Sequence, residues 1–399
     1  MQAAPPSAPT PSSSDQPQGS PHPASPEHPL RNSVLAVVLG VGALTWAVFP
    51  GNPVIESPSF GGPAILTPGS ELPIVARVAV PWVTEVEGLS LASGSIRIAL
   101  PLVRPPARGA RLSVLARVPQ DCAPGIYDLV VRAGKLEARA HRAVAVLGSI
   151  PERFTVAQIT DLHFGYRAAG EASVQAIVDE LNRLGPRLVL VTGDIAHNGG
   201  HREYDRAQRV LDQLTMPIVV IPGNHDRRGW GAYLTRFGFP YRSVAFGRWT
   251  LLGLDCGHGR DEFTESQFRF IARALDVAEP GRLIVLAHIP LAGARSVRAH
   301  ARAVMELFER KRVPLVLSGH WHYGAEYGTG VAGPGRTQGG TQFVVTVSAG
   351  GWLVKKPSGS RDPRGFTLIT VEDGRITAVE AHSAGVVKTP TAGAREANP

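Results

Sequence analysis

The sequence predicts an α/β fold, a two-sheet α/β sandwich that follows a small all-β domain and an N-terminal membrane helix. From residue 152 to 386, short apolar runs alternate with amphipathic stretches, which is typical of strands joined by crossover helices. From residue 53 to 149, short apolar runs are separated by Gly and Pro. An uncharged apolar segment precedes both regions, and a chain of 399 residues has room for two folded units.

The N-terminal region divides into a tail and an apolar segment. Residues 1–32 are rich in Pro, Ser, Ala and Gln, so we expect them to be disordered. Residues 33–50 predict a transmembrane anchor at the short end of the spanning range of about 17 to 25 residues. Arg31 precedes this segment and the next basic residue is Arg77, which predicts a cytoplasmic amino terminus. The rest of the chain would then lie outside the cytoplasm, in the periplasm or the extracellular space.

Two alternatives to the anchor stay open. A cleaved signal peptide would also contain such a segment, but the leader is long and no Ala-x-Ala cleavage site follows it. A buried core helix is the other alternative.

The charge and cysteine content narrow the possible partners. Lys and Arg number 41 against 33 Asp and Glu, which permits attraction to nucleic acid, anionic lipid or a phosphorylated substrate. A solvated Arg-rich surface explains the same excess of basic residues. Because the chain has no long basic run, a nucleic-acid partner is not strongly implied. Cys122 and Cys256 are the two cysteines of the chain, which argues against a disulfide framework and a thiolate metal site.

Residues 53–149 predict an immunoglobulin-like or fibronectin-like β-sandwich, because their apolar residues alternate and no helical period appears. No cluster of catalytic residue types occurs here, so we expect a spacer, or a lid beside the active site. The expected strands span residues 74–80, 95–100, 111–118, 126–132 and 136–146.

Residues 152–386 predict the α/β domain, and the tail at 387–399 is expected to be disordered. The alternation of strands with helices predicts parallel strand pairing with crossover helices. The expected strands span residues 154–159, 188–191, 218–221, 249–254, 283–287, 315–317, 343–347 and 366–371; the expected helices span 171–184, 202–214, 265–277 and 297–310.

Five groups of polar residues follow strands of this domain. A single His after a strand is usually a structural residue, but five such groups at the carboxyl ends of strands predict a ligand site. The groups are Asp161 with His163, Asp194, Asn224 with His225, His288, and His320 with His322.

These residue types suit a pair of divalent metal ions. A carboxylate such as Asp194 can bridge two ions about 3.5 to 4 Å apart, which lower the pKa of a shared water and so provide a nucleophile for phosphate esters. Imidazole and oxygen ligands without thiolate favour transition metals such as Mn, Fe or Zn over Ca or Mg. Asp161, His163 and His322 could complete one site, and Asn224, His288 and His320 the other.

His225 directly follows the proposed ligand Asn224 and could protonate the departing oxygen as a general acid. Asp226 is the expected partner that orients His225 and keeps it charged. Arg227 and Arg228 could hold a phosphate oxygen, although Arg beside a loop is more often solvated.

The motif order D-x-H, GD, GNH followed by an acid, a lone His and G-H-x-H resembles that of the calcineurin-like metallophosphoesterases over about residues 153–385. This resemblance implies a binuclear metal centre with the ligands given above and a catalytic His at His225. The segments around Asp161 and His288 are similar to the bacterial branch that includes cyclic-nucleotide phosphodiesterases. Purple acid phosphatases carry a metal-binding Tyr three residues after the bridging Asp, where this chain has His197. This departure argues against a tyrosinate-type ligand. His197 is a candidate substrate-binding residue, and it stays open whether it contacts the metal ligands or is merely exposed.

The sequence thus predicts a membrane-anchored phosphoesterase with a small phosphorylated substrate, a phosphodiester in preference to a phosphomonoester. A nucleotidase, a phosphatase of lipid or envelope headgroups, and a nuclease are alternative enzymes. A cell-surface binding protein with a relic phosphoesterase domain is the alternative from another class. The sequence does not specify the oligomeric state.

Overall fold

The computed structural model describes residues 54–77, 88–104, 111–133, 136–256, 263–291, 299–327 and 340–384. The predicted tails at 1–32 and 387–399 and the predicted anchor at 33–50 lie outside the described residues. Within those described, no helix is both long and apolar enough to cross a membrane.

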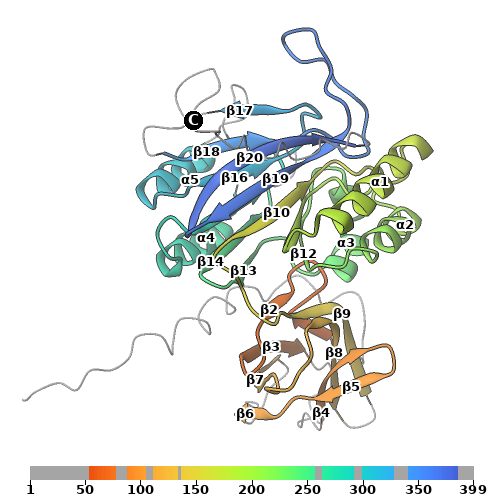
Figure 1. The fold of residues 1–399 in the computed structure, drawn as a ribbon, viewed down its shortest axis with the longest axis vertical. Coiled ribbons are helices and arrows are strands. Elements are labelled where there is room, and N and C mark those ends of the chain that lie inside the picture. Colours follow the sequence, from red (N-terminus) through yellow and green to blue (C-terminus); the bar gives the residue numbers. More distant parts are fainter. Residues whose placement is uncertain are drawn as a thin grey trace, which may run out of the picture.

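Two sheets form the centre of the α/β region (Figure 1). In the first sheet, three neighbouring parallel strands are followed by two antiparallel ones; in the second, four parallel strands have an antiparallel strand at each edge. The first sheet has the order β12 (Ile218–Ile221), β11 (Leu188–Thr192), β10 (Phe154–Ile159), β19 (Gly365–Glu372) and β20 (Arg375–Ser383). The second has the order β13 (Arg242–Phe246), β14 (Trp249–Leu254), β15 (Leu283–Ala287), β16 (Leu315–Ser318), β18 (Gln342–Val345) and β17 (Ala325–Tyr327).

The two sheets share one apolar core, and helices cover their outer faces. Because both faces are covered, every residue of β11 and β15 is buried, which explains their unbroken apolar sequences. The predicted α/β arrangement is therefore confirmed. Helices α1 (Ala168–Leu184), α2 (His201–Leu211) and α3 (Trp230–Phe237) pack on the first sheet, and α4 (Glu265–Val277) and α5 (Ala299–Arg310) on the second.

The N-terminal β region contains two further sheets around a separate apolar core. Its assignment as an immunoglobulin-like or fibronectin-like sandwich stays a prediction, as do the predicted domain boundaries. One sheet has the order β1 (Val54–Ser57), β3 (Glu71–Arg77), β7 (Arg111–Arg117) and β6 (Leu102–Arg104). The other has the order β2 (Ala64–Leu66), β9 (Leu136–Val146), β8 (Gly125–Ala133), β4 (Gly88–Ser93) and β5 (Ile96–Ala99).

The β region is attached to the α/β region near the amino end of β12. Arg142 donates hydrogen bonds to the carbonyls of Leu214 and Met216, just before this strand. Phe60 is 3% exposed and packs on Phe237, with 5.7 Å between ring centroids. The contacts of Arg142 lie at the amino end of β12, whereas the polar groups predicted from the sequence follow the carboxyl ends of strands. The β region is therefore attached away from these polar groups.

Candidate metal centre

Backbone hydrogen bonds join the loops that follow β10, β11, β15 and β16. The N–H of Asp161 donates to the carbonyl of Gly193 over 3.0 Å, and the N–H of His163 to that of Asp194 over 2.9 Å. The N–H of Gly319 likewise donates to the carbonyl of His288 over 2.9 Å. The structure therefore brings groups that are far apart in the sequence to one edge of the sheets, as expected for the carboxyl ends of parallel strands.

The backbone at this edge adopts an unusual conformation. Eight described residues other than glycine have a positive φ, and five of them are predicted metal ligands. A non-glycine residue in this region is strained, and such strain is concentrated at functional sites. The five residues are Asp161, His163, Asp194, His320 and His322, with φ between 47° and 71°.

Two glycines allow these loops to approach one another closely. A Cβ at Gly223 would lie 2.1 Å from Oδ1 of Asp194, and a Cβ at Gly319 would lie 2.5 Å from Oδ2 of Asp161. The motifs GNH and G-H-x-H therefore need their glycines, because a carboxylate, and at Gly319 also the hydroxyl of Thr160, occupies the space of the missing side chain.

Asp161, His163 and His322 form the first ligand group, and each is at most 2% exposed. Nε2 of His322 lies 3.1 Å from Oδ1 of Asp161 and 3.2 Å from Nε2 of His163. Nδ1 of His322 donates to the carbonyl of Trp352 over 2.8 Å, so Nε2 keeps its lone pair in the neutral ring. Burial lowers the pKa of His163 to about 3, which keeps this imidazole neutral and able to bind a metal.

Asp194, His288 and His320 form the second group, with Asn224 beside them. Nδ1 of His288 donates to the carbonyl of Thr192 over 2.8 Å. Its Nε2 then faces Oδ1 of Asn224 at 3.1 Å and Oδ2 of Asp194 at 3.4 Å. Burial opposes protonation of His288, but the carboxylate of Asp194 raises its pKa to about 9.

Two features indicate that these groups suit bound cations. While His322 is neutral, Oδ1 of Asp161 is buried and accepts no hydrogen bond from the residues that the structure describes, which is costly for a carboxylate. Nε2 of His288 faces two oxygens that do not donate, so a proton or a metal ion has to lie between them. The donors are imidazole nitrogens and carboxylate or amide oxygens, a set that fits divalent transition metals. The structure thus fits the predicted use of divalent ions; their number, their identity and the role of each ligand stay predictions.

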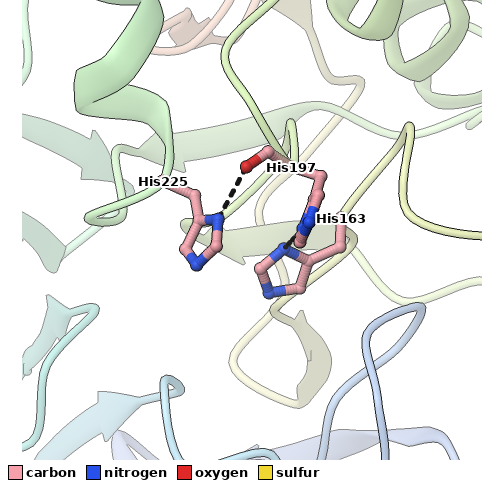
Figure 2. Close-up of side chains that lie close together, drawn as sticks. All are labelled: His163, His197 and His225. Atoms are coloured by element: carbon pink, nitrogen blue, oxygen red, sulfur yellow. Dashed lines mark hydrogen bonds between the residues drawn. The ribbon is translucent and has the colours of Figure 1, made fainter.

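The structure gives His225 a different partner from the predicted one. Nδ1 of His225 donates to the carbonyl of His197 over 2.6 Å (Figure 2). Its Nε2 lies 4.0 Å from Oδ2 of Asp194. The backbone N–H of His225 donates to Oδ1 of the same carboxylate over 2.8 Å. The ring is therefore held between the loop that follows β11 and the proposed metal ligands.

Asp226 does not orient His225, so this prediction is corrected. Its carboxylate is fully buried and accepts hydrogen bonds from the N–H groups of Ile195, Ala196 and Gly223 and from the hydroxyl of Tyr204. Burial, together with the charge of Asp194, raises the pKa of Asp226 to about 6. Asp226 therefore ties together the loops that carry Asp194 and Asn224.

The two arginines differ in their surroundings. The guanidinium of Arg227 forms an ion pair with Asp255 and stacks on Trp230, 3.8 Å from the ring centroid. Its charge is therefore already compensated by an acid that the sequence analysis did not single out. Nη1 of Arg228 donates to the carbonyl of His197 over 3.2 Å, which places it next to the bond from His225. A contact of either arginine with substrate stays a prediction.

An aromatic wall borders the first ligand group, formed by Trp352 together with Tyr166, a pairing that is not evident from the sequence. The Trp352 ring is 4.1 Å from that of His322 and 4.9 Å from that of His163, between centroids. Trp352 is 37% exposed, which is unusual for so large an apolar side chain. Tyr166 lies 5.6 Å from Trp352 and 5.1 Å from His197. The exposed Trp after two glycines was the available signal for this wall.

Comparison with known proteins identifies the family. The family model described as calcineurin-like phosphoesterase matches residues 154–324, which include both ligand groups. A probable cyclic nucleotide phosphodiesterase of Rhodopseudomonas palustris is 30% identical over 247 residues, covering 55% of this chain and 88% of the relative. A 3',5'-cyclic-nucleotide phosphodiesterase of Nostoc is 28% identical over 190 residues, covering 42% of this chain and 71% of the relative.

A solved structure supports the fold. The purple acid phosphatase PPD1 of yellow lupin aligns with a TM-score of 0.52 and 15% identity, covering 82% of this chain and 71% of the phosphatase. At this identity the likeness concerns the fold alone. Together with the family model and the Rhodopseudomonas relative, it confirms the resemblance that the motifs indicate. The chain belongs to the calcineurin-like phosphoesterase family and is a hydrolase of phosphate esters.

Proposed function

We propose that this chain is a phosphodiesterase with a binuclear metal centre in which Asp194 is the bridging ligand. One observation supports this most strongly. Oδ2 of Asp194 lies 3.5 Å from Nε2 of His163 in the first ligand group and 3.4 Å from Nε2 of His288 in the second. A single carboxylate oxygen between two groups of ligands is what a metal pair requires.

When bound, the two ions supply a nucleophile at neutral pH by lowering the pKa of a water, and they neutralise charge on the phosphoryl oxygens. His225 is the proposed general acid. Its Nδ1 is engaged with the carbonyl of His197, so Nε2, which faces the centre, is the atom that exchanges a proton with the leaving oxygen. Asp194 holds this ring in place through the backbone N–H of His225.

The proposed substrate is a phosphodiester, with a cyclic nucleotide as the first candidate. The names of the Rhodopseudomonas and Nostoc relatives and the exposed ring of Trp352 beside His163 support this choice. A planar base can stack on such a ring. Phosphomonoesters, including nucleotides and envelope lipid headgroups, are the alternative.

The test compares three substrates on one preparation of the full chain. Hydrolysis of bis-p-nitrophenyl phosphate, p-nitrophenyl phosphate and 3',5'-cyclic AMP is measured after chelation and after addition of Mn, Fe or Zn. We expect metal-dependent turnover with a higher kcat/KM for both diesters. A higher kcat/KM for the monoester would make the chain a phosphomonoesterase.

We also propose that residues 33–50 anchor the chain, with the catalytic domain outside the cytoplasm, and that the β region is an immunoglobulin-like spacer. The absence of charge from residues 33–49 and the attachment of the β region away from the metal centre support this arrangement. Reporter fusions on either side of residues 33–50 test the topology. A cytoplasmic catalytic domain would contradict it.

A further inference from the structure

We propose that His197 is a positioning residue that sets the tautomer of two neighbouring histidines, that of His163 with its side chain and that of His225 with its carbonyl. This inference rests on the proposed function, because it assigns a role to each of the two histidines. It replaces the substrate contact that the sequence suggests for His197. All three residues are drawn in Figure 2.

The side chain of His197 contacts the edge of the His163 ring that carries Nδ1. Nδ1 of His197 lies 3.4 Å from Nδ1 of His163. On the opposite side of the His163 ring, Nε2 faces Oδ2 of Asp194 at 3.5 Å and Oδ1 of Asp161 at 3.8 Å. Nε2 is therefore the atom that would bind a metal ion, and a neutral His163 then carries its proton on Nδ1.

The direction of the bond between the two rings follows from this assignment. With a proton on its Nδ1, His163 is the donor and His197 the acceptor. When a metal-binding His donates a hydrogen bond from its other nitrogen, that bond fixes the tautomer and the orientation of the ring. The bond also makes the imidazole a stronger ligand for the metal. His197 provides that acceptor.

The carbonyl of His197 performs the same task for His225. It accepts the Nδ1 hydrogen of His225 over 2.6 Å, which leaves Nε2 directed toward the centre. The backbone here is well fixed, because the N–H of His197 donates to the carbonyl of Phe164 over 2.9 Å and Ala196 pairs with Phe164. The bond to His225 consequently does not depend on the side chain at position 197.

Ring packing holds the His197 side chain in place. Its ring stacks on that of His225 with centroids 5.1 Å apart, and meets His163 edge to face at 5.4 Å. Tyr166 lies 5.1 Å away on the outer side. The His197 side chain therefore has two separable properties, the acceptor at Nδ1 and the flat ring.

Two substitutions separate these properties. His197→Phe keeps a flat ring and removes the acceptor; His197→Asn loses the ring and keeps an oxygen acceptor near His163. His201→Ala, the loss of an exposed His four residues away at the start of α2, is the matched control. Metal affinity is measured by competition with a chelating dye on the full chain, and kcat and KM are measured at saturating metal.

We expect His197→Phe to weaken the binding of one of two metal equivalents by about 10- to 100-fold, the usual effect of losing such a hydrogen-bond partner. His197→Asn should bind metal more tightly than His197→Phe, and His201→Ala should match the wild type. At saturating metal, KM should stay unchanged in all variants, because the proposed role gives the His197 side chain no contact with substrate. Thermal unfolding of each variant checks that the fold is intact.

Two results would overturn the inference. Tighter metal binding by His197→Phe than by His197→Asn would show that the ring matters through packing. Unchanged metal affinity with a raised KM would show a substrate contact. The wild type could bind two metal ions but hydrolyse no ester, with His197→Phe weakening the binding of one of the two ions. In that case the positioning role holds and the proposed function fails. A wild type that binds no metal would overturn both.

Discussion

His225 donates its Nδ1 hydrogen to the main-chain carbonyl of His197 over 2.6 Å. A backbone acceptor cannot be removed by substitution and cannot change its charge. The tautomer of His225 is therefore set by the path of the chain after β11, and Nε2 is directed toward Asp194 independently of the acid at position 226.

Replacement of His225 should separate turnover from metal binding. His225→Ala removes the proposed general acid, so we expect kcat for a diester to fall by about 10²- to 10⁴-fold. Its side chain belongs to neither of the two ligand groups that contain a carboxylate, so two metal equivalents should remain, as measured by elemental analysis after dialysis. A variant that kept full activity would remove His225 from the mechanism.

Replacement of Asp194 should abolish turnover and metal binding together. Asp194→Asn leaves one oxygen where a carboxylate faces both ligand groups. The loss of metal affinity should exceed the roughly 10- to 100-fold typical of an outer hydrogen-bond partner. Asp205→Asn, at an exposed acid on α2, is the control and should behave like the wild type. Normal metal content in Asp194→Asn would show that Asp194 is not the bridge.

Asp226 should matter for stability rather than for the protonation of His225. In Asp226→Asn one carboxylate oxygen becomes an amide donor that faces the N–H groups of Ile195 and Gly223. Each buried group left without a partner costs about 1–3 kcal/mol, so urea unfolding should show a loss of this size. The basic limb of the pH profile of kcat should be unchanged in the folded variant. If Asp226→Asn were as stable as the wild type but its pH profile of kcat had a shifted basic limb, the predicted pairing of Asp226 with His225 would be supported after all.

The contact between the β and α/β regions should depend on pH through His141. Hydrogen bonds to Asp128 and Asp212 raise the pKa of this His to about 9, above its ordinary value near 6.5. A raised pKa in the folded state means that the contribution to stability is complete below about pH 6.5 and is lost as the pH rises through 9. Because His141 is partly exposed, the effect should be about 1 kcal/mol or less.

The measurement is thermal unfolding between pH 6 and 10 of the wild type and His141→Asn. The wild type should lose more stability than the variant over this range. Parallel curves would show that the ion pairs with Asp128 and Asp212 contribute nothing.

The sequence was sufficient for the elements with the strongest patterns. The unbroken apolar runs at 188–191 and 283–287 predicted strands, and the structure confirms them as β11 and β15. Among the elements that were missed, α3 has eight residues, too few for a helical period to stand out, and the edge strand β13 is partly exposed and begins with Arg and Ser, so it lacks an unbroken apolar run. The edge strand β20 alternates weakly because much of it is exposed.

The ligand groups were predictable because each follows a strand at a recognisable motif. The partner of His225 was not, since a carbonyl has the same sequence signature at every residue. Adjacency in the sequence suggested Asp226, but side chains of consecutive residues at the start of a helical turn point in different directions. The pairing of Tyr166 with Trp352 could not be predicted, because only folding brings the two rings together.

The most direct test of the binuclear centre is a stepwise metal titration of the chelated full-length protein, with metal binding and diester hydrolysis followed together. We predict two bound equivalents of Mn, Fe or Zn and activity that reaches its maximum only with the second, because Asp194 contacts both ligand groups. Full activity in the presence of chelator, or no metal bound at saturation, would contradict the account.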